Sequence, residues 1–151
     1  MTTANNDNFQ LTPAAIAEAA AVLAAQCHGA SLNAGWWKDK ATGLDLIAVV
    51  RNPQTPIERL LAGALIAQKL CLVHSETSEA MEGARKGLMD DKLPHRPMIE
   101  VEIADGIIRF FDLGGAMALD VPGAIAEKMA FNAVRPDHKP EARAAAGGKA
   151  F

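Results

Sequence analysis

The chain has 151 residues, of which 50% are hydrophobic and 22% are charged, and its formal net charge is -3. This length suffices for one compact domain and is too short for two domains of ordinary size. The interspersed charges give no basic surface of the kind that neutralises nucleic-acid phosphates, so we expect no nucleic acid duplex as a partner. Alanine makes up about a fifth of the residues and tyrosine is absent, which favours closely packed helices over a β sandwich.

Cysteine usage and apolar patterning indicate the cellular location. Cys27 and Cys71 lack the spacing of a zinc site or of a disulfide framework. The first ten residues are polar, and no apolar stretch reaches the roughly 18 uninterrupted residues of a membrane span. We therefore expect a cytoplasmic protein with no membrane partner.

The first predicted helix follows a capping signature. Thr12 and Pro13 form an N-cap and first-turn pair, and the alanine-rich run after them predicts a helix to about Cys27 that ends near Gly29. Residues 30–56 contain several glycines and prolines around a short apolar piece, which predicts a connector with at most one short helix.

The second predicted helix begins at Thr55 and Pro56 and meets no terminating signal until Gly87. Its length of about 31 residues corresponds to roughly 46 Å. Because residues 57–73 are apolar on nearly every face, we expect neighbouring helices to surround this segment. This helix is the expected spine of a bundle.

The remaining elements are also helical. Residues 88–97 predict a loop that reverses the chain, and a third helix is expected from about Met98 to Leu113, closing at Gly114 and Gly115. A fourth helix is expected from near Val121 to just before Pro136. We therefore expect a single all-α domain over residues 1–151 with its core at about 56–136, followed by an irregular tail over 137–151.

Four acidic residues occupy positions that suit a metal site. Glu76 and Glu79 continue an apolar stripe of leucines on the second helix, and Glu102 and Asp105 lie on the polar side of the third. Residues three apart on a helix are about 5–6 Å apart at Cβ, so each pair is aimed at one point. Four converging carboxylates would repel one another unless cations neutralised them, and oxygen ligands select Mg²⁺ or Mn²⁺. The alternative is that they are ordinary surface groups, with Asp105 paired to Arg109 four residues later.

The fourth predicted helix carries a polar stripe made of Lys128, Asn132 and Arg135. Two cations beside a carboxylate metal site are what a polyphosphate ligand requires. A solvated face near a helix C-terminus, where positive charge is favoured, is the alternative.

The order of these motifs resembles a known family. Glu76-Thr-Ser-Glu79, then Glu102-Ile-Ala-Asp105, then Lys128-x-x-x-Asn132-x-x-Arg135 resembles the ExxE, ExxD and KxxxNxxR series of the all-α nucleoside triphosphate pyrophosphatase superfamily, the MazG-like proteins with their dimeric dUTPase and dCTP pyrophosphatase relatives. The match covers about residues 57–136. The resemblance implies a four-helix-type bundle, assembly as a homodimer or homotetramer, and hydrolysis of a nucleotide to its monophosphate and pyrophosphate. Many members have a glutamate where this chain has Ser75.

Phosphoanhydride hydrolysis assigns roles to these residues. It needs metal ions that neutralise developing charge and a water held in line with the leaving group. The four carboxylates would hold Mg²⁺, or Mn²⁺, and Glu76 and Glu79 are the candidate catalytic residues, with Glu76 expected to orient or deprotonate the water. Lys128 and Arg135 would bind phosphates, Asn132 the sugar or a phosphate oxygen, and Arg109 would fix Asp105.

The base-binding residues are expected in the N-terminal connector. Relatives that this chain resembles use His and Trp side chains of this region, and here Trp36, Trp37 and His28 are the candidates. The alternative for the tryptophans is that they fill the bundle end or a subunit interface. The alternative for His28 is that it stands near a helix C-terminus for electrostatic reasons alone. The loop at residues 90–96 could close over phosphates through Lys92, His95 and Arg96, or be a solvated turn.

Three hypotheses follow. The first is a Mg²⁺-dependent pyrophosphohydrolase of (deoxy)nucleoside triphosphates. The second keeps the site and changes the substrate to dUTP or dCTP alone, or to another phosphoanhydride such as phosphoribosyl-ATP or an alarmone. The third is a helical interaction or metal-binding module without turnover. A homo-oligomer is expected in addition, because one chain offers few helices to cover the apolar second helix.

Overall fold

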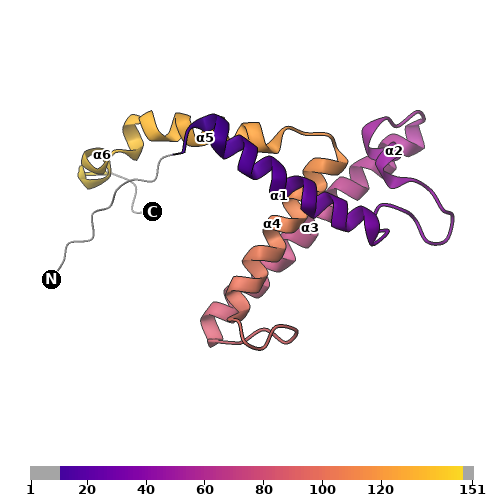
Figure 1. Cartoon of the computed structure of the whole chain (residues 1–151), viewed down its shortest axis with the longest axis horizontal. Helices are drawn as coiled ribbons and strands as arrows, with labels where there is room; N and C mark the ends of the chain where they lie inside the picture. The colour runs from indigo at the N-terminus through magenta and orange to yellow at the C-terminus, as the bar shows by residue number, and fades with distance from the viewer. Residues whose placement is uncertain (1–10, 148–151) are drawn as a thin grey trace. The chain divides into compact units, whose positions relative to one another are not determined.

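The computed structural model describes residues 11–147, and every regular element in that range is helical (Figure 1). The predicted all-α class is therefore confirmed. In chain order the elements are α1 (Pro13–Asn33), α2 (Leu46–Arg51), α3 (Pro56–Lys86), α4 (Met98–Ala116), α5 (Val121–Val134), the short 3-10 helix η1 (Pro136–His138) and α6 (Pro140–Ala144).

The chain divides into two compact units. One unit comprises residues 22–120, with the C-terminal part of α1 and all of α2, α3 and α4. The other comprises residues 1–21 and 121–151, with the start of α1 and with α5, η1 and α6. The candidate carboxylates belong to the first of these, which we call the α3/α4 unit.

The long helix α3 has the boundaries that the sequence predicts. The Thr55 hydroxyl accepts a hydrogen bond from the backbone N–H of Glu58, whose carboxylate accepts one from the backbone of Thr55. This capping box satisfies amides that the first helical turn leaves without partners. At the other end Gly87 adopts φ +65°, a left-handed conformation that terminates helices and suits glycine.

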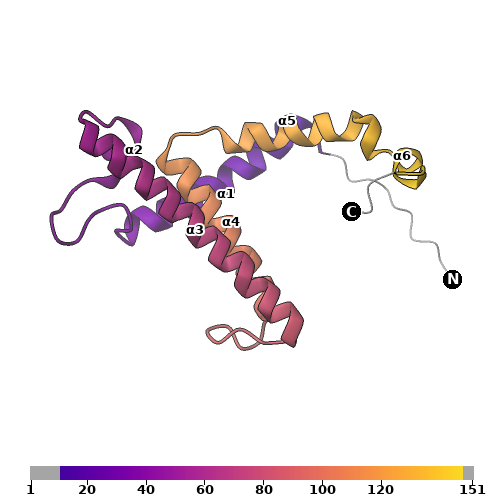
Figure 2. The same ribbon diagram turned by 180° about the vertical axis from the view of Figure 1, so that it is seen from behind.

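Helices α3 and α4 lie side by side and antiparallel, as both ribbon views show (Figures 1 and 2). Gly83 near the end of α3 faces Met98 at the start of α4, and a Cβ at Gly83 would lie 2.9 Å from the Met98 Cβ. Two turns earlier on α3, Glu76 lies beside Gly106 of α4. This pairing places residues of the two acidic motifs at the same level of the helix pair.

A small apolar core joins the connector and α2 to the end of α4. Trp37, Leu113 and Ala116 are buried together, and the side chains of Leu46 and Ile47 pack against them. Arg51 at the end of α2 donates hydrogen bonds to backbone carbonyls near the end of α4, from Nε to Ala116 (2.7 Å) and from Nη2 to Gly115 (2.8 Å). These bonds bring a side-chain donor to carbonyls of the last turn of α4, of which Gly115 also accepts from the backbone N–H of Ala118 (3.1 Å).

Two predicted helix boundaries are wrong. Helix α1 continues through Gly29 to Asn33, and α4 continues through Gly114 and Gly115 to Ala116. A glycine inside a helix costs only about 1 kcal/mol, and the turn of α1 beyond Gly29 is held by the Ser31 hydroxyl, which donates to Asp112 of α4. At Gly115 the contact requires glycine, since a Cβ would lie 2.6 Å from the His28 Cγ. The tail is also more regular than predicted, with η1 and α6 as far as Ala144; residues 148–151 lie outside the described range.

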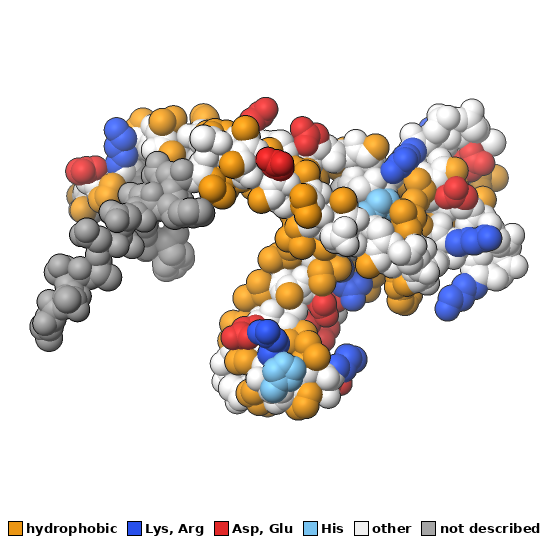
Figure 3. All heavy atoms as spheres, viewed as in Figure 1, with side chains coloured by type: hydrophobic (Ala, Val, Ile, Leu, Met, Phe, Trp, Pro, Cys, Tyr) orange, Lys and Arg blue, Asp and Glu red, His pale blue; other side chains and the backbone are white. Residues whose placement is uncertain are grey.

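The chain leaves much apolar surface uncovered. Ile57 and Leu60 on α3 are 78% and 77% exposed, although neighbours were expected around this segment. Ile103, Ile107 and Phe110, on one side of α4, are also exposed. Hydrophobic side chains are visible at the surface of this helix pair in Figure 3. Within residues 22–120, α3 therefore lacks some of the neighbours that it was expected to have.

One described helix, α1, is long and apolar enough to cross a membrane by length and composition. Its C-terminal turns carry His28 and Ser31, which bind a buried carboxylate of α4 as described below. The predicted absence of a membrane partner stays a prediction.

Candidate metal site and adjoining cavity

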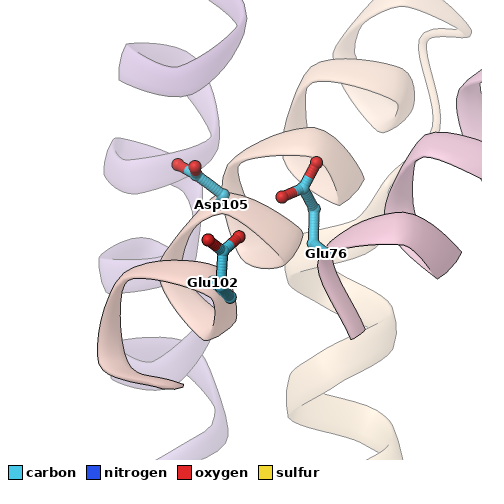
Figure 4. Close-up of side chains that lie close together, drawn as sticks. All are labelled: Glu76, Glu102 and Asp105. Carbon is cyan, nitrogen blue, oxygen red and sulfur yellow. The ribbon is translucent and has the colours of Figure 1, made fainter. Parts of the chain in front are cut away.

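Three of the four predicted carboxylates meet between α3 and α4. Glu76 projects from α3, and Glu102 and Asp105 project from α4 (Figure 4). One carboxylate oxygen of each lies within 4.8 Å of the others, and Glu76 and Glu102 are buried. Gly106 of α4 lies beside Glu76 at the same level, and a Cβ there would be 3.9 Å from the Glu76 Cβ, an ordinary van der Waals distance.

The proximity of these acids makes their ionisation unfavourable. The pKa of Glu102 is raised to about 7, first by burial and then by a hydrogen bond with Glu76 and by the negative charges around it. The pKa of Asp105 is raised as well, first by burial and then by Glu76, while the Arg109 guanidinium acts in the opposite direction. A divalent cation would remove this repulsion, so the donor set fits a hard metal ion.

Glu79 lies outside this group of three. Its side chain is exposed, and its Oε1 accepts a hydrogen bond of 2.9 Å from the Ser75 hydroxyl. Its negative charge still contributes to the raised pKa of Glu102. Glu79 is therefore within electrostatic range of the three carboxylates while remaining accessible to solvent.

Arg109 binds a different partner from the one expected. Its Nε donates to Glu76 Oε1 at 2.6 Å, across the two helices, whereas the sequence suggested an ion pair with Asp105 on the same helix. The Glu76 side chain is 7% exposed and the Arg109 side chain is 40% exposed, so the carboxylate is shielded from solvent while the guanidinium remains accessible. Arg109 thus supplies positive charge directly to the carboxylate group.

A second polar cluster surrounds Asp112, one turn beyond Arg109. The buried Asp112 carboxylate accepts hydrogen bonds from Ser31 Oγ (2.8 Å) and Trp37 Nε1 (2.7 Å), and His28 Nδ1 lies 2.9 Å from Oδ1. Lys69 Nζ lies 3.8 Å from Oδ2. We call these five residues the Asp112 cluster. Asp112 was not among the residues predicted from the sequence, because its partners lie 43 to 84 positions away along the chain.

A cavity of about 450 Å³ connects the two clusters. Asp105 and Arg109 line it from the metal-site side, and Lys69 and Asp112 line it from the other. Its remaining walls are Cys27, Ala30, Ser31, Ala34, Trp36, Leu72 and Ile108. A concave site with apolar walls and a few convergent charges is typical of small-molecule binding.

The two tryptophans have different environments. Trp36 lines the cavity and is 65% exposed, whereas Trp37 is 3% exposed and belongs to the apolar core. His28 packs against Gly115 and contacts Asp112. Of the three predicted base-binding residues, Trp36 alone presents an exposed ring to the cavity, while Trp37 and His28 have structural contacts.

Two residues of the predicted phosphate-binding stripe, Lys128 and Asn132, lie on α5, in the unit that contains residues 121–151, and Arg135 directly follows this helix. Lys128 Nζ is 4.9 Å from the Phe131 ring centroid, and Arg135 is ion-paired with Asp137 (2.6 Å). The Asn132 Oδ1 atom is buried without a hydrogen-bond partner among the described residues. Lys128 and Asn132 share α5, whereas Arg135 follows the last residue of α5, Val134, with an extended backbone, so the predicted stripe on one helix is wrong at Arg135.

The loop between α3 and α4 is organised by Asp90. The buried Asp90 carboxylate accepts hydrogen bonds from the backbone N–H groups of Lys92 and Leu93, at 3.0 and 2.5 Å. The Lys92 side chain pairs with Asp91, and Arg96 pairs with Glu100. The positive charge of Lys92 nevertheless acts on Asp105, where it works to lower a pKa that burial and Glu76 raise.

No family model, curated protein or solved structure matches this chain. The argument for function therefore depends on the geometry of the α3/α4 unit.

Proposed function

We propose that the chain is a Mg²⁺-dependent nucleotide pyrophosphohydrolase that cleaves (deoxy)nucleoside triphosphates to the monophosphate and pyrophosphate. One observation carries this proposal. Asp105, one of the three clustered carboxylates, and Arg109, which is ion-paired with Glu76 of the same cluster, both line the cavity. A ligand in this cavity would therefore lie against a metal ligand and a guanidinium at once, as hydrolysis of a phosphoanhydride requires.

Each residue has a distinct role in this mechanism. Glu76, Glu102 and Asp105 hold the metal ion, which when bound supplies positive charge to phosphate oxygens. Glu79 orients the attacking water, because it is exposed, lies outside the ligand group and is itself held by Ser75. Trp36 offers an aromatic face for the nucleobase, and stacking of this kind discriminates weakly between bases.

The proposed assembly is a homodimer or homotetramer in the cytoplasm. Exposed apolar residues on α3 and α4 support it, because a second copy would cover them and complete a four-helix-type bundle around α3. Lys128, Asn132 and Arg135 remain the proposed ligands for the phosphates and the sugar.

A panel of nucleotides tests the proposal. The purified chain is incubated with Mg²⁺ and each of the eight common ribo- and deoxyribonucleoside triphosphates, dUTP, phosphoribosyl-ATP and an alarmone, and release of pyrophosphate and monophosphate is measured. We expect turnover that falls at least about 100-fold in Asp105→Asn and is unchanged in Asp91→Asn, a matched change at an exposed carboxylate. Cleavage of dUTP or dCTP alone would select the narrower substrate. No turnover of any substrate, together with a more stable Asp105→Asn variant, would show a module without catalysis.

A further inference from the structure

Lys69 is a cation with unfilled hydrogen-bonding capacity at the cavity wall. Its side chain is 19% exposed, and its ammonium lies 4.3 Å from the Trp37 ring centroid and 3.8 Å from Asp112 Oδ2. The second distance is an ion pair and exceeds hydrogen-bond length. Within residues 11–147 no hydrogen bond uses the Lys69 ammonium, which carries three N–H donors.

Within the described range, Arg109 also has N–H donors without an acceptor at the wall of the same cavity. Its Nε donates to Glu76, and the part of the chain that the structure describes provides no acceptor for either terminal amino group. A guanidinium has five N–H donors, so four of them remain for a ligand. Lys69 and Arg109 line the cavity together from α3 and α4.

The two cations are close enough to disfavour each other. The pKa of Lys69 is lowered, first by burial and then by the Arg109 charge, while Asp112 acts in the opposite direction. Asp112 already accepts hydrogen bonds from Ser31 and Trp37, so it offers limited capacity to the ammonium. An anion placed between Lys69 and Arg109 would relieve their repulsion and accept their free N–H groups.

We propose that Lys69 and Arg109 form an anion subsite in this cavity that binds a phosphoryl group. A tetrahedral phosphoryl group has several acceptor oxygens. It can therefore accept hydrogen bonds from an ammonium on one helix and a guanidinium on the other. The identification of the anion as part of a nucleotide rests on the proposed function. Asp112 and Trp37 act as positioning residues, because they hold the Lys69 ammonium at the cavity wall.

Asp105 makes the subsite dependent on the metal. Its carboxylate lines the same cavity and would repel an anion while it is ionised. A divalent cation on Glu76, Glu102 and Asp105 would remove that repulsion and would also compete with Arg109 for Glu76. Inorganic pyrophosphate should therefore bind more tightly with Mg²⁺ than with a chelator.

Calorimetric titration of the full chain with inorganic pyrophosphate tests the subsite, in Mg²⁺ and in EDTA. In Mg²⁺ we expect Lys69→Gln to weaken binding by about tenfold or more and Lys69→Arg to stay within about threefold of the wild type. Lys40→Gln, which removes one exposed charge, should leave the affinity unchanged. Arg109→Gln gives an independent second variant with the same expected loss as Lys69→Gln, should Lys69→Gln fail to fold by near-UV circular dichroism.

The outcomes separate this inference from the proposed function. If the wild type binds pyrophosphate, Lys69→Gln weakens that binding and no triphosphate is hydrolysed, the subsite is supported and the proposed enzymatic function is refuted. Hydrolysis with an unchanged pyrophosphate affinity in both Lys69→Gln and Arg109→Gln would refute the subsite alone. Absence of pyrophosphate binding to the wild type in Mg²⁺ would also refute it.

Discussion

Arg109 Nε lies 2.6 Å from Glu76 Oε1, so a cation of the protein itself occupies one side of a carboxylate that is proposed to bind metal. The guanidinium and a metal ion would compete for this oxygen, because each withdraws its negative charge from the other. Arg109 therefore stabilises the helix pair without metal and competes with metal for Glu76. Five predictions follow from this and other contacts.

Removal of Arg109 should tighten metal binding. In Arg109→Gln we expect Mn²⁺ to bind about threefold to tenfold more tightly, because Glu76 no longer has a competing cation. Titration followed by electron paramagnetic resonance of free Mn²⁺ measures this. Arg85→Gln, at an exposed pair with Glu82, is the matched control and should not change the affinity. Weaker Mn²⁺ binding in Arg109→Gln would contradict the competition.

Without metal, stability should fall as pH rises through the titration range of Glu102. The pKa of Glu102 is about 7 in the folded chain and near 4.5 when unfolded, so the folded state binds more protons between these values. The stabilisation present below about pH 4.5 is lost as pH approaches and passes 7. We expect a loss of roughly 1–2 kcal/mol after allowance for solvent screening. Urea unfolding in EDTA should show this slope, and Glu102→Gln should flatten it.

Asp112→Asn should destabilise the fold, because it weakens the contacts that Ser31, Trp37 and Lys69 make with α4. The amide has one acceptor oxygen where the carboxylate has two, and it leaves Lys69 without a counter-charge. We expect a loss of about 2–4 kcal/mol in the free energy of unfolding. Denaturant titration followed by tryptophan fluorescence measures it, since Trp37 is a direct partner. A variant as stable as Asp91→Asn would show that the cluster contributes little.

Gly115→Ala and Gly63→Ala should shift stability in opposite directions. At Gly115 the new Cβ would lie 2.6 Å from His28 Cγ, so α1 must move away and about 1–3 kcal/mol is lost. At Gly63, a position inside α3, no atom lies within 4 Å of a new Cβ, and the gain in helix propensity is about 0.5–1 kcal/mol. Thermal unfolding of both variants checks the pair. Equal melting temperatures would mean that α1 does not pack on α4 as described.

The apolar surface of α3 should mediate self-association. Leu60 is 77% exposed, and Leu60→Glu would place a charge on that surface. Light scattering should give a dimer or tetramer for the wild type at micromolar concentration and a smaller species for Leu60→Glu. A wild-type monomer across the concentration series would contradict the proposed assembly.

Local signals in the sequence predicted the helices well. Thr55, Pro56 and Gly87 bound α3 because capping chemistry and left-handed glycine act within a few residues of the helix end. Predictions failed at Gly29, Gly114 and Gly115, where glycine suggested helix ends but both helices continue, and at Gly115 the helix packs directly on His28. Helix propensity is a small energy that packing readily exceeds.

The sequence by itself determined the four longest helices, α1, α3, α4 and α5, and that acidic side chains recur at one-turn spacing on two of them. Only the tertiary structure decided that Glu76, Glu102 and Asp105 meet while Glu79 stays exposed, and that Arg109 binds Glu76. It also decided that Trp37 is buried against Asp112 while Trp36 faces a cavity with Lys69. Helical periodicity gives the direction of a side chain relative to its own axis, whereas its partners depend on how two helices are rotated and shifted against each other. That choice is made by packing of the whole unit, which spacing along the chain does not encode.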